Sequence, residues 1–390
     1  MKKTEAINIL QRRLEVLEGK LSRRSLLTVE SRPGAEIVVQ GKRVINFASN
    51  DYLGLASDGL AVGVSDVPGG AGASRLLAGN LQIFNDCEQL LAVWLGREKT
   101  RLFSSGYLAN IGAIGALARD GDIVFSDSLN HASIVDGCRL SKARTIVYPH
   151  RDVCALAKLI DENPPKPNGL RLVVTESLFS MDGDVAPLKE IAELKERFGF
   201  LLMVDEAHSL GAFGPEGRGL CSGMEIDECA DIIVGTLGKA FGVAGAFVAG
   251  ASQIIATLDN FARSFIYSTA PSPLLAPYVT GALQKIQNAG AQREKLKNNA
   301  ITLRSGLKEL GLNVGGAGFS PIIPVILGDN GTALRFSRRL FEKGVLAPAI
   351  RPPTVPKNGA RIRFSVSAAH SEKQLDKTLR AVADVKNMDG

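Results

Sequence analysis

An aspartate stands where a buried strand would present it to a ligand. Apolar residues, FLLMV, run directly into Asp205, and His208 follows three positions later. In open α/β sheets, ligands bind beyond the carboxyl ends of the parallel strands. On position alone, Asp205 could equally cap the next helix. Its place in the chain therefore makes Asp205 a candidate ligand-binding residue, and a helix cap is the structural alternative.

Lys239 lies in a glycine-rich loop, GTLGKAFG (235–242), with almost no other charge beside it. A lysine in a poorly solvated site has a lowered pKa and can form a Schiff base. The loop does not fit a P-loop, because Ile233 stands five positions before Gly238 and Ala240 follows the lysine. The best candidate for a nucleotide-hydrolysing P-loop in this sequence is therefore excluded.

A third signal is SSGYLANIGAIGAL (104–117), which leads from a strand end through Gly106 into a helix. This layout aims backbone N–H groups at an anion such as phosphate. Tyr107 in the same turn and His131 in SDSLNHASI supply flat rings that could stack on a heteroaromatic ligand or simply pack. GGAGASRLLAGN (69–80) lacks the strand before it that dinucleotide binding requires.

Together, an acid, a lysine, an anion-binding helix start and stacking rings are the parts of a pyridoxal phosphate (PLP) site. In such a site the carboxylate keeps the pyridine nitrogen protonated, the ring accepts electrons, and the lysine holds the aldehyde as an imine. Each part alone is weak evidence, whereas the combination is strong. No pattern of metal ligands accompanies them.

The elements that must position these residues follow an α/β pattern. Continuous apolar runs alternate with amphipathic stretches, which predicts a mostly parallel sheet with helices on both faces. The expected strands are 100–104, 122–126, 144–149, 171–176, 200–205, 231–236 and 245–250, with a helix over 187–198. In the last third we expect helices within 274–311, strands near 321–327, 345–350 and 360–366, and a closing helix from about Ser371.

These elements predict a large domain and a smaller α+β lobe. We expect an N-terminal helix and extended segment (1–48) that packs with the small lobe, a large cofactor-binding domain (49–275) and a small C-terminal α+β domain (276–390). An apolar stripe along the N-terminal helix predicts docking on the rest of the fold; it consists of Ile7, Leu10, Leu14, Leu17 and Leu21.

Composition narrows the class of protein. Of 390 residues, 45% are hydrophobic and 22% charged, which excludes disorder as the dominant state. The net charge of +6 is spread along the chain without a basic tract of the kind that binds nucleic acid. The 5 cysteines form no CxxC pair, which favours a reducing, cytoplasmic location. No apolar run reaches the ~18 residues that span a bilayer.

Several longer motifs resemble the PLP-dependent α-oxoamine synthases of the type I aminotransferase fold. They are SNDYLGL (49–55), GGAGASRLL, SGYLAN, DSLNHAS, TESLFSMDGDVAPL (175–188), VDEAHSLGAFGPEGRG (204–219), GTLGKAFG and IYSTAPSP (266–273). They cover most of the chain in the family's order. The segment 56–69 looks several residues shorter than is usual in the family.

Within the family, two C-terminal stretches point to a particular reaction. AIRPPTVP (349–356) and ARIRFSVSAAH (360–370) are most similar to the member of biotin biosynthesis that condenses L-alanine with a pimeloyl thioester, on coenzyme A or acyl carrier protein. A glycine-using synthase is the nearest alternative. More distant ones are an aminotransferase and a non-enzymatic cofactor-binding homologue, although the presence of Lys239 counts against the latter.

The resemblance implies a role for each matching residue. Lys239 carries PLP as an imine, Asp205 pairs with the pyridine nitrogen, and His131 stacks over the ring. The other implied cofactor contacts are Gly106, Tyr107, Ser180, His208 and Thr236, with Ser268 or Thr269 reaching the phosphate across a homodimer that shares its active site. The implied substrate contacts are Asn50, His131, Arg351 and Thr354, with Arg23 or Arg24 next to Ser22, the ungapped position of the family's arginine.

Overall fold

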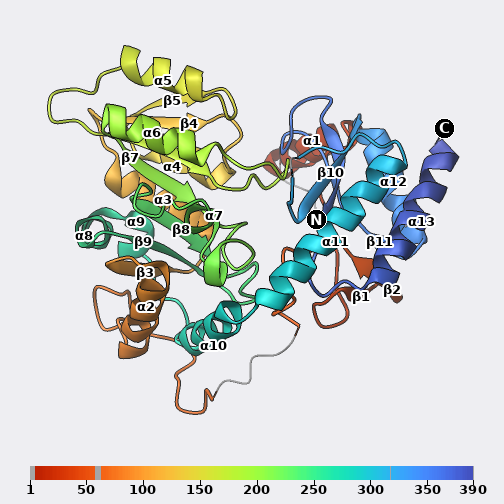
Figure 1. Ribbon diagram of the computed structural model, residues 1–390, viewed down its shortest axis with the longest axis horizontal. Helices are drawn as coiled ribbons and strands as arrows, with labels where there is room; N and C mark the ends of the chain where they lie inside the picture. The colour runs from red at the N-terminus through yellow and green to blue at the C-terminus, as the bar shows by residue number, and fades with distance from the viewer. Residues whose placement is uncertain (1–4, 58–62, 317, 390) are drawn as a thin grey trace. The chain divides into compact units, whose positions relative to one another are not determined.

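The computed structural model describes residues 5–57, 63–316 and 318–389, and these residues form two compact units (Figure 1). Unit 1 comprises Met1–Ser49, Met181–Gly183 and Leu296–Gly390, and unit 2 comprises Asn50–Ser180 and Asp184–Lys295. Residues 58–62, in the segment that looks short for the family, lie outside the description. Within the described ranges, no helix combines the length and apolar character needed to cross a membrane.

Unit 2 is built on a mixed sheet whose strands follow the order β3-β9-β8-β7-β6-β4-β5. The strands are β3 (Lys99–Phe103), β4 (Ile123–Asp127), β5 (Arg144–Tyr148), β6 (Arg171–Glu176), β7 (Leu201–Asp205), β8 (Ile232–Thr236) and β9 (Ala246–Gly250). Strand β9 is antiparallel to both its neighbours, and the remaining strands run parallel to one another. The predicted mostly parallel sheet is therefore confirmed.

Helices flank this sheet on both faces (Figure 1). They are α2 (Gln82–Leu95), α3 (Gly106–Leu117), α4 (Ala132–Leu140), α5 (Val153–Glu162), α6 (Leu188–Phe198), α7 (Leu220–Gly223), α8 (Ser252–Phe261), α9 (Arg263–Ile266) and α10 (Leu275–Gln287), with a 3₁₀ turn at Pro215–Gly217. Helix α3 is apolar on all sides, so it is buried: Ala113 and Ile114 pack with Ile134 of α4 and Ile255 of α8. This cluster fixes the start of α3 at the sheet edge.

The helical stretch expected over 274–311 is two helices, α10 and α11 (Gly290–Glu309), separated at residues 288–289. Helix α10 packs against α2 and groups with unit 2. The second boundary consequently falls at Lys295, 20 residues beyond the expected 275.

Unit 1 contains two small sheets. One has the order β1-β2-β11 and the other β10-β13-β12. The strands are β1 (Glu36–Val39), β2 (Lys42–Asn46), β10 (Ile322–Gly328), β11 (Val345–Leu346), β12 (Ala349–Ile350) and β13 (Ala360–Ser365); the helices, besides most of α11, are α1 (Glu5–Gly19), α12 (Asn330–Glu342) and α13 (Glu372–Asp389). The single strand expected near 345–350 is split, because β11 pairs with β2 whereas β12 pairs with β13.

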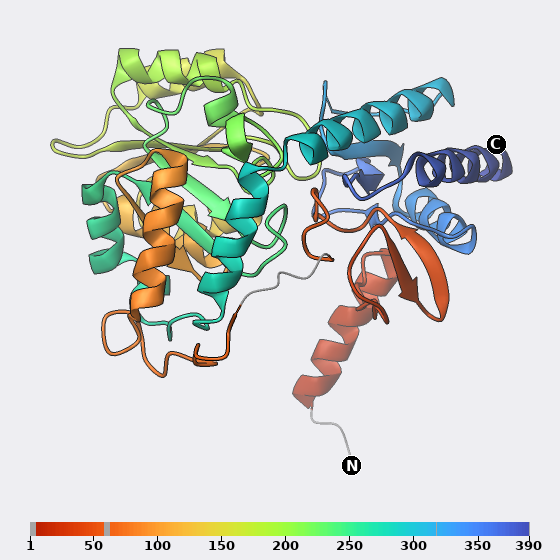
Figure 2. The ribbon, with the colours of Figure 1, turned by 60° about the horizontal axis from the view of Figure 1, so that its bottom comes forward.

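Helix α1 forms as predicted, but its expected docking on the rest of the fold is wrong for the described chain. None of its residues is buried, and Leu10 is 51% exposed. Figure 2 shows the helix extending away from β1 and β2 of the same unit. The amphipathic pattern thus predicts the helix correctly, but it does not predict that the apolar stripe stays unburied in the described chain.

Candidate functional site

A cavity of about 180 Å³ opens at the carboxyl edge of the sheet in unit 2, beside the start of α3. It gathers seven of the residues expected at a cofactor: Gly106, Tyr107, His131, Asp205, His208, Thr236 and Lys239. Asn110, Ser133, Glu176 and Ala207 complete the lining. The strand-end residues and the helix start, which are far apart in the sequence, thus meet in one place.

Strand alternation explains why three strand ends supply side chains to the same cavity. Successive side chains of a strand point to opposite faces, so residues two apart share a face. Glu176, Asp205 and Thr236 each lie two positions after a residue of the core beneath α3: Val174, Met203 and Val234. The last side chains of β6, β7 and β8 therefore continue that core face into the cavity.

Asp205 is held in a fixed orientation by two donors. Asn110 Nδ2 donates to its Oδ2 over 2.7 Å, and the backbone N–H of Ala207 donates to its Oδ1 over 2.9 Å. Asn110 Nδ2 also donates to Ser133 Oγ over 2.9 Å. The carboxylate is thus connected through Asn110 and Ser133 to the residues around His131.

His131 is the N-cap of α4, and its Nδ1 accepts from the backbone N–H of Ser133 over 3.2 Å. In the neutral ring the proton therefore lies on Nε2. Burial lowers the pKa of His131; the charge of Asp205 opposes this shift and that of Lys239 adds to it. The imidazole is consequently a neutral, flat group, with the Tyr107 ring edge-on at 6.4 Å.

His208 is fixed by a buried tyrosine that sequence reasoning did not single out. Tyr52 Oη lies 2.6 Å from His208 Nδ1 and 3.4 Å from Asn50 Oδ1. Tyr52 is fully buried, so its hydroxyl cannot move away to solvent. This contact brings the predicted Asn50 into the neighbourhood of His208.

A tight turn positions Lys239. The backbone N–H of Val243 donates to Leu237 O and that of Gly242 donates to Lys239 O, both over 2.9 Å. Gly242 has a φ of 66°, and a Cβ there would lie 2.4 Å from the backbone nitrogen of Ala56. Only glycine fits this turn, which accounts for one glycine of the GTLGKAFG loop.

Glu176 is a cavity residue that sequence reasoning missed. Its carboxyl is fully buried, and Oε1 has no hydrogen-bond partner among the described residues. Burial and the charge of Asp205 raise the pKa of Glu176 to about 8, although the charge of Lys239 opposes the shift. The signal was present in the sequence, because Glu176 ends an apolar strand just as Asp205 does.

Two of the expected cofactor residues do not line this cavity. Ser180 is not among the lining residues, but its backbone N–H donates to the carboxyl of Glu176, which does line the cavity. Thr269 forms a bridge with Ser74 and lines a separate small cavity that also contains Ser268 and Arg75.

The expected substrate residues of unit 1 form a group of their own. Arg24 Nη2 donates to Thr354 Oγ1 over 3.0 Å, and Arg351 donates to Leu21 O. Both arginines line a cavity of about 80 Å³, and burial together with the charge of Arg24 lowers the pKa of Arg351. Arg23 instead pairs with exposed Glu18 over 2.8 Å. The geometry thus groups Arg24, rather than Arg23, with Thr354.

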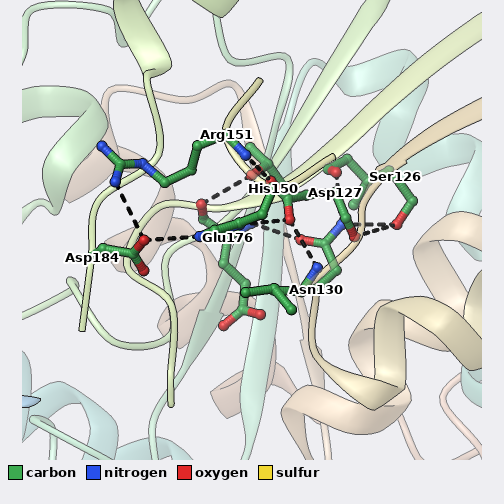
Figure 3. Close-up of polar contacts among 10 residues, drawn as sticks. Ser126, Asp127, Asn130, His150, Arg151, Glu176 and Asp184 are labelled. Atoms are coloured by element: carbon green, nitrogen blue, oxygen red, sulfur yellow. Dashed lines mark hydrogen bonds and ion pairs between the residues drawn. The ribbon is translucent and has the colours of Figure 1, made fainter. Parts of the chain in front are cut away.

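A second histidine–carboxylate group lies at the carboxyl ends of β4 and β5 (Figure 3). His150 is 2.8 Å from Asp127 Oδ1 through Nδ1 and 2.8 Å from Asp184 Oδ2 through Nε2. Burial lowers the pKa of His150, but the two carboxylates outweigh it and raise the pKa to about 9. The Arg151 guanidinium adds a further contact to Asp184. The His150 ring is therefore protonated and bridges the carboxylates of Asp127 and Asp184.

Comparison with known proteins identifies the family. The profile of aminotransferase class I and II matches residues 42–382. The chain belongs to this family. An 8-amino-7-oxononanoate synthase from Anaeromyxobacter sp. (strain Fw109-5) is 45% identical over 98% of this chain and 96% of its own.

Solved structures of the family agree in fold. A serine palmitoyltransferase from S. paucimobilis with a bound PLP–myriocin aldimine has a TM-score of 0.91 at 30% identity, covering 98% of this chain and 97% of its own. An 8-amino-7-oxononanoate synthase from Francisella tularensis has a TM-score of 0.76 at 28% identity, covering 89% of this chain and 98% of its own. The type I PLP-dependent transferase fold is therefore confirmed.

The cavity of this aminotransferase-family chain has the groups that PLP needs. Lys239 offers an amine for the aldehyde, Asp205 a carboxylate for the ring nitrogen, and His131 a flat neutral ring. The start of α3 at Gly106 offers backbone N–H groups for the phosphate. Buried Asn110 Oδ1 also lacks a partner among the described residues, which fits a cavity built around a polar ligand.

Proposed function

We propose that this chain condenses L-alanine with a pimeloyl thioester, carried by coenzyme A or acyl carrier protein, to give 8-amino-7-oxononanoate for biotin biosynthesis. The reaction releases carbon dioxide and the thiol carrier. The observation that carries the proposal is the cavity in which Lys239, Asp205 and His131 meet. The chain that forms it is 45% identical, over 98% of its length, to an 8-amino-7-oxononanoate synthase.

The cofactor of this reaction is PLP, which withdraws electrons from the amino acid's α-carbon. Lys239 Nζ would hold the cofactor by its aldehyde, and its amine would remove the α-proton of the amino acid as general base. Asp205 keeps a proton on the ring nitrogen, since Asn110 and the Ala207 N–H hold the carboxylate in place. His131 packs its neutral ring against the bound ligand.

The terminal carboxylate of the pimeloyl chain is recognised by the arginine group of unit 1. Arg24 and Arg351 place two guanidinium groups around Thr354 in one small cavity, an arrangement suited to an anion. The pimeloyl chain ends in such an anion, a carboxylate. Replacing Arg24 with alanine should raise the KM for the pimeloyl thioester, whereas Arg23→Ala should leave it unchanged.

The working form that we propose is a cytoplasmic homodimer in which Thr269 or Ser268 reaches the phosphate of the neighbouring subunit. Exposed apolar side chains on α1 support a partner surface, and the five free cysteines support a reducing compartment. Light scattering of the purified protein gives the mass, and mixing Lys239→Ala with Thr269→Ala chains tests the sharing. Activity regained in the mixture supports a shared site, and none contradicts it.

A condensation assay tests the function directly. The purified protein, loaded with PLP, is given L-alanine and pimeloyl-CoA, and the aminoketone is scored by mass. We expect the product with alanine and none with glycine or serine. Formation of a keto acid without the thioester would instead indicate an aminotransferase.

A second candidate is a synthase that joins another amino acid to another acyl thioester. The higher TM-score of the serine palmitoyltransferase than of the Francisella synthase favours testing it. Parallel reactions with serine or glycine and with palmitoyl-CoA or acetyl-CoA separate the two candidates, because only the proposed enzyme requires the terminal carboxylate of the pimeloyl chain.

A further inference from the structure

Glu176 lies beside Asp205 on the neighbouring strand. The two residues are register partners in the parallel pair β6–β7, and both line the cavity of unit 2. The backbone N–H of Glu176 donates to Asn130 Oδ1 over 3.2 Å, which holds the strand end against β4. In Figure 3 the carboxyl of Glu176 points away from Asp127 and His150.

Another fully buried glutamate shows what a purely structural carboxylate looks like in this protein. Glu206 accepts from the backbone N–H groups of Cys221 and Leu220 and from the hydroxyls of Ser177 and Ser209. Both of its oxygens are therefore compensated. Glu176 is buried as well, and its carboxyl accepts from the backbone N–H groups of His131 and Ser180, but its Oε1 has no partner among the described residues.

The groups that face Glu176 favour a neutral acid. Asp205 brings a negative charge from β7, Lys239 a positive charge from the loop after β8, and His131 a neutral ring from the start of α4. Two carboxyl groups thus share one ammonium. The Glu176 carboxyl accepts from the backbone N–H groups of His131 and Ser180, but its Oε1 has no partner among the described residues, whereas both oxygens of Asp205 accept from a donor. The extra proton therefore belongs on Glu176 Oε1.

We propose that Glu176 is a ligand-binding residue of this cavity: a protonated carboxylic acid whose O–H donates a hydrogen bond to an anionic oxygen of the bound ligand. Under the proposed function, on which this inference rests, that oxygen belongs either to the ring hydroxyl of PLP or to the carboxylate of the amino acid. A neutral donor at this point stabilises the anion without adding a second positive charge beside Lys239.

The first test uses the PLP-free protein and needs no activity. Urea unfolding is followed from pH 5 to pH 9 for the wild type, for Glu176→Gln, which mimics the neutral acid, and for Glu190→Gln, the same change at an exposed site on α6. The unfolded carboxyl loses its proton near 4.5 and the folded one near 8. Wild-type stability should therefore fall relative to Glu176→Gln as the pH rises through this window.

Glu190→Gln should follow the wild type throughout. Parallel curves for the wild type and Glu176→Gln would show that Glu176 is not held as a neutral acid and would overturn the inference.

The second test follows the visible absorbance of PLP bound to Lys239 as a function of pH. Glu176→Gln should still bind PLP, because the amide keeps a donor, whereas Glu176→Leu removes it. For Glu176→Leu we expect the pH at which the band changes to move by at least about half a unit. A shift with PLP alone assigns the ring oxygen, and a shift only after addition of L-alanine assigns the carboxylate. An unmoved band in both arms contradicts contact with the ligand.

The outcomes separate this inference from the proposed function. A wild type that binds PLP but forms no aminoketone refutes the proposed function, while the urea and absorbance readouts still judge Glu176. Conversely, unchanged urea curves and an unmoved band refute the inference even where condensation proceeds.

Discussion

The group around His150 and the group around Asp205 both combine a histidine with carboxylates at the carboxyl edge of one sheet. The two groups differ in whether the histidine is protonated and balances the charge of those carboxylates. His150 carries a positive charge between Asp127 and Asp184, so its two acids are paired. In the cavity, His131 is neutral, and the carboxyl groups of Asp205 and Glu176 face one cation, Lys239.

This difference separates groups that hold the fold from groups that are available to a ligand. A hydrogen-bonded ion pair favours the charged forms of both partners in the folded state. The resulting pKa shift is a measure of how much the pair stabilises the fold. Buried carboxyl groups without a matched positive charge lower stability, and groups with such perturbed pKa values concentrate at functional sites. We therefore expect mutations in the cavity to change activity and mutations around His150 to change stability.

Replacing Lys239 with alanine should have the largest effect. The general base and the anchor of the cofactor are lost together, so turnover should fall by at least about 1000-fold. The visible absorbance that borohydride bleaches in the wild type should disappear, while the urea midpoint changes little. Lys158→Ala, on the exposed face of α5, is the matched control. Retained absorbance and turnover in Lys239→Ala would remove the basis for the proposed site.

Asp205→Asn keeps the shape of the side chain and removes its charge. Without a carboxylate at the ring nitrogen, turnover should fall by roughly 100-fold. Asp127→Asn, the same change in the other group, should leave kcat within about threefold and lower the free energy of unfolding by about 1–3 kcal/mol. Steady-state kinetics and urea unfolding of both variants test the comparison, and an activity loss confined to Asp127→Asn would reverse it.

The fold and the centre of the site were predictable from the sequence because their signals are local. Continuous apolar runs predict the strands, and a charged residue directly after such a run, as at Asp205, predicts the sheet edge. Lys239 stood out because glycines surround it. Glu176 carries the same strand-end signal as Asp205 and could have been found by the same rule.

Other features depend on contacts that no local pattern encodes. Arg23 and Arg24 are adjacent in sequence, and only the turn after α1 decides that Arg24 meets Thr354. The stripe on α1 predicts a helix but not what covers it. Likewise, the pairing of His150 with Asp184 joins residues 34 positions apart, so the histidine carried no recognisable signal.

His150→Gln should lower stability in a pH-dependent way. The pKa of His150 is raised from 6.5 in the unfolded chain to about 9 in the folded one. Its stabilisation is thus fully present below pH 6.5 and is lost as the pH rises through 9. We expect a deficit of about 1–2 kcal/mol at pH 6 that shrinks towards pH 9.5, measured by urea unfolding. A deficit that does not depend on pH would mean that a protonated His150 ring does not stabilise the fold through its two carboxylates.

The smallest effect is expected from Tyr52→Phe, which tests whether a single hydrogen bond tunes the cavity. Removing the hydroxyl deletes the 2.6 Å contact to His208 Nδ1, which helps to set the orientation and tautomer of the ring. We expect kcat to fall by roughly 3- to 10-fold, since one neutral hydrogen bond contributes about 1 kcal/mol. Tyr148→Phe is the matched control, because Tyr148 is equally buried but does not line the cavity, so loss of its hydroxyl should leave kcat unchanged. Equal kcat values for the two variants would show that the contact with Tyr52 packs the site but does not tune it.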